Sequence, residues 1–164
     1  MNLNNLLGSI GIRSNLVGDV SFLILFLAFS LAVSFVLGKR RMVVSLLGVY
    51  AAYGIINLAR FDFLKEPSTK TLVFLALLIG FVLFFSKIWR GSISGHGPVL
   101  VAKLFLGTVI VTGLSLSVVL SWQTSKELTD LITPSARKFF TDDFWRFVWS
   151  IAPLVYLGVV KRID

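Results

Sequence analysis

Four long apolar runs, separated by short polar interruptions, set the pattern of most of the chain. The runs occupy residues 20–37, 42–58, 71–89 and 99–120. As a helix, the first run would rise about 27 Å, which is close to the roughly 30 Å hydrocarbon core of a bilayer. The pattern therefore predicts a four-helix transmembrane core within residues 19–120.

A fifth apolar run, residues 144–160, follows a polar stretch and is weaker than the others. Arg146 would have to extend its side chain to the membrane interface, and Pro153 is expected to kink the helix. We predict that residues 144–164 form a fifth transmembrane helix with a basic tail, so that the bundle has four to five spans. Candidate caps precede this helix: Thr141, Asp142 and Asp143.

Two polar segments flank this core. In residues 121–143, Thr124 and Glu127 have the spacing of a capping box, and the apolar residues that follow share one helical face. We predict an amphipathic helix in the membrane interface, which is either a docking surface outside the cytoplasm or a linker. Residues 1–18 also show helical spacing, which fits either an amphipathic surface helix or a frayed tail.

The composition places the chain in the membrane. Hydrophobic residues make up 56% of the 164 residues and charged residues 15%, against about 25% charged residues in soluble domains. The net charge of +8 comes mostly from residues at the ends of the apolar runs, where anionic headgroups attract them. We therefore expect membrane lipids as partners, and no nucleic acid.

The short turn GKRR at residues 38–41 indicates the orientation of the spans. Lysine and arginine in short loops are retained in the cytoplasm, so Lys39, Arg40 and Arg41 are the expected topology determinants. Alternation from a cytoplasmic turn places the N-terminus and residues 121–143 outside. With five spans, the C-terminus is cytoplasmic.

Small residues four positions apart recur in the first four predicted spans. Such pairs let helix backbones approach closely, which matters in a membrane because lipid supplies no hydrophobic drive between helices. We predict that these pairs form the packing seams of the bundle. They are Ala28 and Ala32, Gly48 and Ala52, Ala76 and Gly80, and Gly113 and Ser117.

Residues suited to catalysis or metal binding are scarce. The chain has no cysteine, its one histidine is His96 in the loop sequence SGHG, and the predicted spans contain no Asp or Glu. A metal site, a nucleophile with its base, or a paired acid and base needs more than this. We therefore predict no catalytic site, no metal, no cofactor and no enzymatic activity.

Lys103 is a charge about one turn inside the fourth predicted span, where burial at the bilayer centre would cost about 3 kcal/mol. It is either an interface lysine that snorkels or a lysine that faces a cavity or partner. The candidate partner or cavity contacts are Lys103, Lys126, Asp130, Arg137 and Lys138.

The layout resembles the colicin V production protein family of bacterial inner-membrane proteins. The features that carry the resemblance lie within about residues 19–145: Asp19, the GKRR turn, the opening MVVSLLGVYAAY of the second span, and glycines of the fourth (Gly97, Gly107, Gly113). The resemblance implies a protein of the bacterial cytoplasmic membrane connected with envelope maintenance or export. It carries over no catalytic residue.

The sequence thus predicts an all-α integral membrane protein, a bundle of four to five transmembrane helices with an amphipathic interfacial helix. The expected function is a non-enzymatic role in envelope maintenance or export. The alternatives are a structural or accessory subunit of a larger membrane complex, and a small pore or transporter. The envelope or export role and the subunit role would both involve membrane protein partners or a homo-oligomer.

Overall fold

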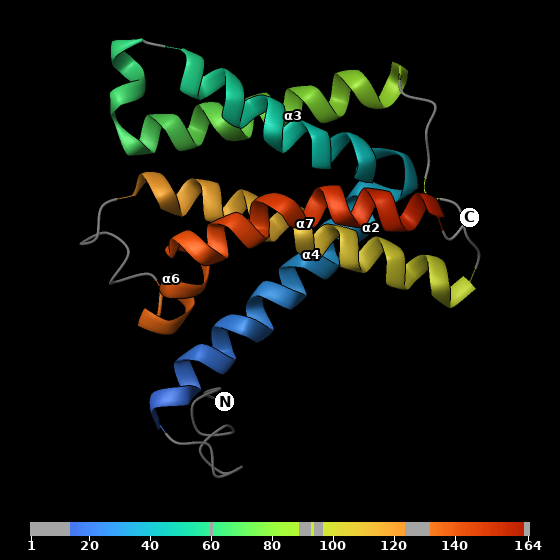
Figure 1. Cartoon of the computed structure of the whole chain (residues 1–164), viewed down its shortest axis with the longest axis horizontal. Helices are drawn as coiled ribbons and strands as arrows, with labels where there is room; N and C mark the ends of the chain where they lie inside the picture. The colour runs from blue at the N-terminus through green and yellow to red at the C-terminus, as the bar shows by residue number, and fades with distance from the viewer. Residues whose placement is uncertain (1–13, 60, 89–92, 94–96, 124–131, 163–164) are drawn as a thin grey trace.

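The computed structural model describes residues 14–59, 61–88, 93, 97–123 and 132–162. This part of the chain is helical and contains no strand. Its helices are α2 (Ser14–Leu58), the short 3-10 helix η1 (Asp62–Lys65), α3 (Pro67–Ile88), α4 (Gly97–Trp122), α6 (Pro134–Thr141) and α7 (Asp143–Arg162) (Figure 1). Four of them, α2, α3, α4 and α7, are long and apolar enough to cross a membrane. The protein is thus an all-α, multi-pass membrane protein.

Helix α2 contains both of the first two predicted spans. Its apolar part extends over 41 residues, and a straight helix of that length would be about 61 Å long, twice the hydrocarbon thickness. At Gly38, however, the backbone has φ 60° and ψ −175°, and the chain turns back sharply (Figure 1). We call residues 14–37 the first arm and residues 39–58 the second arm. Each arm is long enough for one crossing.

The turn is narrower than the predicted four-residue loop. Gly38 is the residue within α2 whose backbone is not helical, so it forms the turn by itself. A side chain is strongly disfavoured at its combination of φ and ψ. Lys39, Arg40 and Arg41 are helical and form the first turn of the second arm, with their side chains exposed. The hairpin therefore needs no connecting loop.

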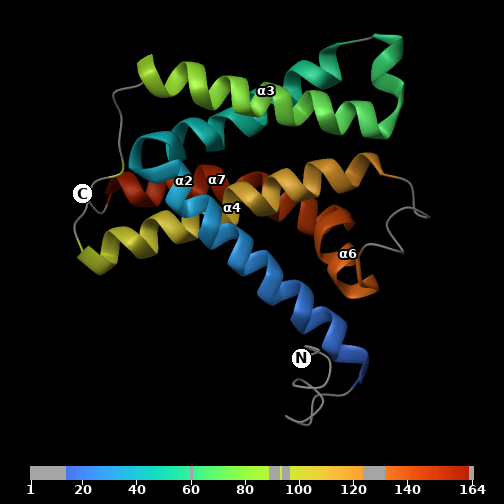
Figure 2. The ribbon, with the colours of Figure 1, turned by 180° about the vertical axis from the view of Figure 1, so that it is seen from behind.

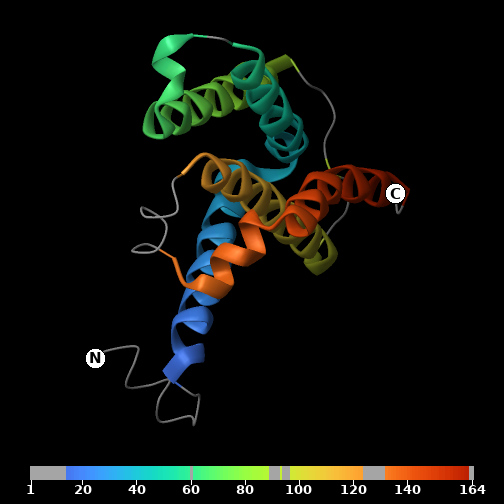
Figure 3. The ribbon, with the colours of Figure 1, turned by 60° about the vertical axis from the view of Figure 1, so that its left-hand side comes forward.

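The helix ends gather at two opposite ends of the bundle (Figures 1 and 3). The Gly38 end holds the α2 turn, the end of α3, the start of α4 and the end of α7. The α6 end holds η1, the end of α4, α6 and the start of α7. At the Gly38 end, the backbone N–H of buried Ile93 donates to the carbonyl of Lys39 at 3.4 Å, which ties the chain between α3 and α4 to the turn. Successive helices therefore run in alternate directions between the two ends of the bundle.

Helix α4 lies at the centre of the bundle and packs against both arms of α2, against α6 and against α7 (Figure 2). One face of α4 is buried along most of its length, from Gly107 to Leu120. Helix α3 packs mainly on the second arm and η1, and Phe74 is its buried residue. The core therefore lies between α2, α4, α6 and α7, with α3 at the periphery.

The polar segment before α7 differs from the prediction. Residues 124–131, which include the expected capping box, lie outside the described residues. The described helix is α6, whose N-cap is Thr133: its hydroxyl accepts from the Ala136 N–H at 3.4 Å, and Pro134 occupies the first helical position. Phe140 of α6 is only 2% exposed. This part of the segment packs into the bundle instead of lying only in the interface.

Helix α7 confirms that the fifth apolar run is helical. Asp142, which is extended, separates α6 from α7: its N–H donates to the Lys138 carbonyl, and its own carbonyl accepts from the Arg146 N–H at 2.9 Å. The helix continues through Pro153, which is fully buried. At the other end of the chain, the predicted 1–18 segment lies outside the described residues up to residue 13, and α2 begins at Ser14.

Candidate functional site

Two glycines of α4 allow α7 to approach closely. A Cβ atom at Gly113 would overlap the indole ring of Trp149, and one at Gly107 would lie 2.7 Å from the hydroxyl oxygen of Tyr156. That hydroxyl donates to the carbonyl of Lys103 at 2.7 Å. Trp149 and Tyr156 are two helical turns apart and therefore share the face of α7 that contacts α4. These contacts fix the position of α7 on the central helix.

The corner between α6 and α7 is closed by aromatic rings. The Phe140 ring stacks on Trp149 with ring centroids 5.5 Å apart, and it meets Phe26 of the first arm at 5.7 Å. The last carbonyls of α6 have no partner in their own helix, and side chains of other helices supply one. Ser117 of α4 donates to the Phe140 carbonyl at 2.8 Å, and the Trp149 indole N–H donates to the Phe139 carbonyl at 3.3 Å.

Beside this corner, a polar cavity of about 240 Å³ lies between the second arm, α4 and α7, toward the α6 end. Tyr53 and Ser150 are exposed at its margin, so a ligand can reach it from the surface. Apolar residues form part of the wall, and the other lining residues carry hydroxyl or guanidinium groups. The lining residues are Val49, Tyr50, Tyr53, Leu114, Ser117, Val118, Ser121, Arg146 and Ser150.

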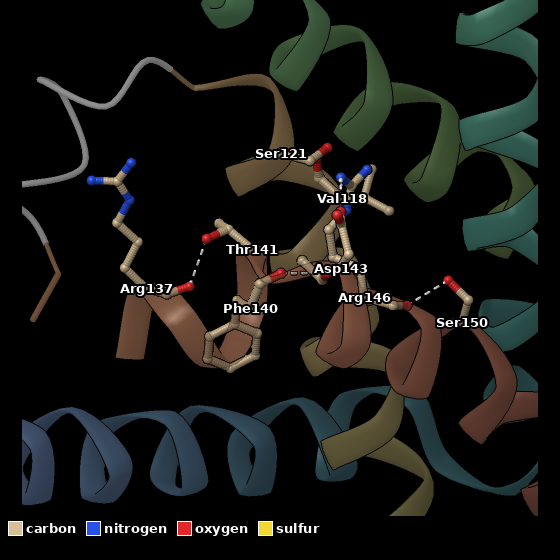
Figure 4. A network of polar contacts seen from close by, with 9 residues as sticks. Val118, Ser121, Arg137, Phe140, Thr141, Asp143, Arg146 and Ser150 are labelled. Carbon is tan, nitrogen blue, oxygen red and sulfur yellow. Dashed lines mark hydrogen bonds and ion pairs between the residues drawn. The ribbon is translucent and has the colours of Figure 1, made fainter. Parts of the chain in front are cut away.

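The hydroxyl groups of the cavity are held in place by backbone carbonyls. The Tyr50 hydroxyl donates to the Ser150 carbonyl, and the Ser150 hydroxyl donates to the Arg146 carbonyl at 2.8 Å. Ser121 donates to the Val118 carbonyl at 2.7 Å (Figure 4). Each oxygen keeps lone pairs that can accept a further hydrogen bond. These hydroxyl groups therefore have fixed positions in the cavity wall.

Arg146 is the one charged residue among those that line the cavity. It stands in the first turn of α7, and its side chain is 43% exposed, as expected for an arginine that reaches the interface. Its guanidinium lies 3.7 Å from the carboxylate of Asp143, which is fully exposed. An exposed pair of this kind contributes little to stability, so an anionic ligand can compete for the guanidinium.

The lining residues suit binding better than catalysis. They include no carboxylate, imidazole or thiol that could activate a serine or tyrosine hydroxyl. In the part of the chain that the structure describes, no group of three or more His, Cys, Asp or Glu residues could hold a metal ion. The guanidinium of Arg146 can hold an anionic group, whereas the hydroxyls that donate to backbone carbonyls offer only acceptor lone pairs.

Two of the four predicted small-residue pairs lie in packing seams. Gly113 and Ser117 are buried at the contact with α6 and α7. Ala52 is fully buried, and a Cβ atom at Gly48 would lie 3.3 Å from the Leu78 side chain of α3. These positions face neighbouring helices.

The residues of the other two pairs are exposed, and Ala28 borders a groove shared with α4. Ala28, Ala32, Ala76 and Gly80 are exposed, and a Cβ atom at Gly80 would meet nothing within 4 Å. The first arm buries Phe26 and Ser30, which lie on a different helical face from Ala28. The spacing in the sequence identifies a helix face with small residues, but it does not show whether that face contacts a neighbouring helix.

The predicted contact residues lie apart from one another. Lys103 stands in α4 toward the Gly38 end and lines a groove between α4 and α7. Arg137 and Lys138 of α6 line a surface pocket of about 370 Å³ at the α6 end, together with Asp142. Lys126 and Asp130 lie outside the described residues.

The cavity and the aromatic corner were not predicted from the sequence. Tyr50, Ser117 and Ser150 come from three different helices, and no local pattern joins them. A usable signal was the seven-residue spacing of Trp149 and Tyr156, which places two large rings on one face of α7. Bulky rings on one helix call for small residues on its neighbour, as Gly107 and Gly113 provide.

No family model, curated protein or solved structure matches this chain. The resemblance to the colicin V production protein family therefore stays a prediction. The assignment of a function has to rest on the geometry of the described helices.

Proposed function

We propose that this protein is a non-enzymatic protein of a bacterial cytoplasmic membrane that binds a small anionic group in its polar cavity, on the non-cytoplasmic side. The observation that carries the proposal is the placement of the Arg146 guanidinium at the wall of a cavity in an otherwise apolar bundle. Carboxylate and phosphate groups are the natural partners of a guanidinium. A role in envelope maintenance or export, which the family resemblance implies, is compatible with such binding.

The distribution of charge supports the orientation. Lys39, Arg40 and Arg41 stand together in one helical turn at the Gly38 end, and Lys87 is exposed at the same end. Basic residues also occur at the α6 end, but there they are mixed with acidic ones. The five acidic residues whose side chains are described all lie at that end: Asp19, Asp62, Glu66, Asp142 and Asp143. A dense basic turn is retained in the cytoplasm, which puts the cavity on the opposite side.

Cysteine labelling tests this orientation without background, because the chain has no cysteine of its own. We expect Lys39→Cys to resist a membrane-impermeant maleimide in intact bacterial cells and to react after permeabilisation. Lys65→Cys, in exposed η1, is the matched control and should react in intact cells. Labelling of Lys39→Cys and protection of Lys65→Cys would reverse the topology.

Anion binding can be measured on the purified protein in a neutral detergent. We expect sodium phosphate to raise the melting temperature above that in sodium chloride of equal ionic strength, in a saturable manner. Binding to the native state alone stabilises by about 2.7 kcal/mol when the ligand exceeds its Kd a hundredfold. Acetate should act in the same way if the site recognises carboxylates.

Arg146→Gln should abolish this stabilisation, because it removes the only charge in the cavity wall. The matched control is Lys65→Gln, which removes one positive charge at the same end of the bundle but outside the cavity. It should keep the response to phosphate. Equal responses of the two variants would attribute the stabilisation to general charge effects and exclude the site.

A subunit role is the second candidate, and the exposed small-residue pairs favour it. Ala32 on the first arm, and Ala76 with Gly80 on α3, offer exposed small residues, while Ala28 borders a groove shared with α4. Recovery of a stoichiometric complex with unrelated membrane proteins in mild detergent would support this role. A pore is less well supported, because apolar side chains such as Met42, Leu46 and Val111 fill the core between the cavity and the Gly38 end.

A further inference from the structure

A long groove follows the contact between α4 and α7 on the outer surface of the bundle. Its volume is about 720 Å³. Several of its wall residues are strongly exposed, including Leu106 at 54% and Phe147 at 64%. Apart from Lys103 and Tyr156, the lining residues are apolar. They are Val99, Ala102, Lys103, Leu106, Ile110, Phe147, Val148, Ile151, Ala152, Val155, Tyr156, Val159 and Val160.

The groove is preformed by packing that the glycine at Gly107 permits. Tyr156 is 4% exposed and lies beneath the groove, where its hydroxyl bonds to the Lys103 carbonyl and its ring occupies the space beside Gly107. The small side chains of Ala102 and Ala152 leave space between the two helices. The shape therefore does not depend on a ligand to separate the two helices.

The length of the groove corresponds to one leaflet of a bilayer. Its lining residues extend from Val99 to Ile110 on α4, which is about 17 Å at 1.5 Å per residue. Half of the hydrocarbon core is about 15 Å thick. An extended acyl chain from the leaflet at the Gly38 end therefore matches the groove along its length.

Positive charge stands near the Gly38 end of this groove, where Lys103 lies about one turn in from Val99 and an extended lysine side chain can reach the headgroup level. Lys103 precedes Gly107 by one turn, and Lys39 precedes Met42 by about one turn. The sulfur of Met42 would lie 3.0 Å from a Cβ atom at Gly107, so Met42 and Gly107 lie at the same level of the bundle. Because α4 and the second arm both begin at the Gly38 end, Lys103 and Lys39 also lie at a similar level. No acidic residue whose side chain is described lies at this end. A headgroup here meets a net positive field.

We propose that the groove binds one anionic phospholipid, with an acyl chain between α4 and α7 and the headgroup phosphate at Lys103. An apolar groove of this length would accept the acyl chain of any phospholipid. The basic residues around it favour a phospholipid with an anionic headgroup. This site lies at the opposite end of the bundle from the polar cavity. Lipid binding in the groove does not depend on which end of the bundle faces the cytoplasm, nor on anion binding at Arg146.

The test compares phosphatidylglycerol with phosphatidylcholine of the same acyl chains, added to the full chain in a neutral detergent. Native mass spectrometry measures the retained lipid, and thermal unfolding measures its affinity. We expect phosphatidylglycerol to be retained and to stabilise more at equal concentration. Equal retention of the two lipids, or a lipid-free dimer as the main species, would overturn the proposal.

Lys103→Gln should reduce the preference for phosphatidylglycerol about fivefold, the effect expected for one lysine near a charged headgroup. Lys87→Gln is the matched control, since it removes one exposed charge at the same end but outside the groove. It should change the preference less than twofold. Equal effects of the two variants on the lipid preference would exclude a headgroup site at Lys103.

A third variant tests the apolar part of the site. Val155 is 56% exposed and lines the groove, so Val155→Trp can fill the groove without entering the core. We expect it to reduce retention of both lipids while keeping the melting temperature of the lipid-free protein. Unchanged retention would show that lipid binds elsewhere. This variant also decides the question if Lys103→Gln fails to fold.

Discussion

Replacement of Gly113 with leucine is expected to destabilise the protein strongly, by about 3 kcal/mol. Even a methyl group at this position would overlap the Trp149 ring, which is itself stacked on Phe140 and hydrogen-bonded to the Phe139 carbonyl. The ring therefore has little freedom to move away. The melting temperature in detergent, followed by circular dichroism, measures the effect.

Gly80→Leu is the control for this prediction. Gly80 is also a helical glycine in an apolar span, but a side chain there would meet nothing within 4 Å. Its melting temperature should stay close to that of the parent. Combining Gly113→Leu with Trp149→Ala should recover part of the loss, because the smaller side chain vacates the space that leucine needs. A Gly113→Leu protein as stable as Gly80→Leu would contradict the packing of α4 on α7.

Replacement of Gly38 with alanine is expected to cost about 1–3 kcal/mol and to disturb the hairpin of α2. No neighbouring atom lies within 4 Å of a Cβ atom at this position. The cost therefore arises from the backbone alone, since φ 60° with ψ −175° is essentially restricted to glycine. Thermal unfolding reports the loss of stability. Cysteine crosslinking between the two arms would report a change in the hairpin.

Gly80→Ala separates this backbone effect from a general effect of alanine. Gly80 is helical with open space around it, and alanine in a helix is more stable than glycine by about 0.5–1 kcal/mol. The two substitutions add the same methyl group and should change stability in opposite directions. Loss of stability in both variants would argue against a turn specific to Gly38.

The spans could be predicted because hydropathy reports directly which solvent a segment prefers. All five apolar runs proved to be helical, although the first two share one kinked helix. The extent of the turn was overestimated: a glycine with positive φ reverses the chain in one residue, and the sequence GKRR does not show how many residues take part. Lys39 to Arg41 follow it as ordinary helix.

The packing was predicted in part, and the cavity was not. Gly113 and Gly48 lie in seams, whereas Ala28, which has the same type of spacing, is exposed. The difference depends on the crossing of α2 and α4, which no local pattern records. Arg146 was recognised as an unusual charge in an apolar run, but its neighbours Tyr50 and Ser117 come from helices about 100 and 30 residues earlier. Only the tertiary structure brings them together.

The closure of the α6 corner has a consequence for the order of assembly during synthesis. Helix α6 leaves the ribosome before α7, yet the donor for its Phe139 carbonyl is the indole of Trp149 in α7. Until α7 has entered the bilayer, that carbonyl lacks its donor and the Phe140 ring lacks its stacking partner Trp149, although Phe26 of the first arm is already present. A released chain truncated between the two helices should therefore leave α6 accessible to protease, and a chain that includes α7 should protect it.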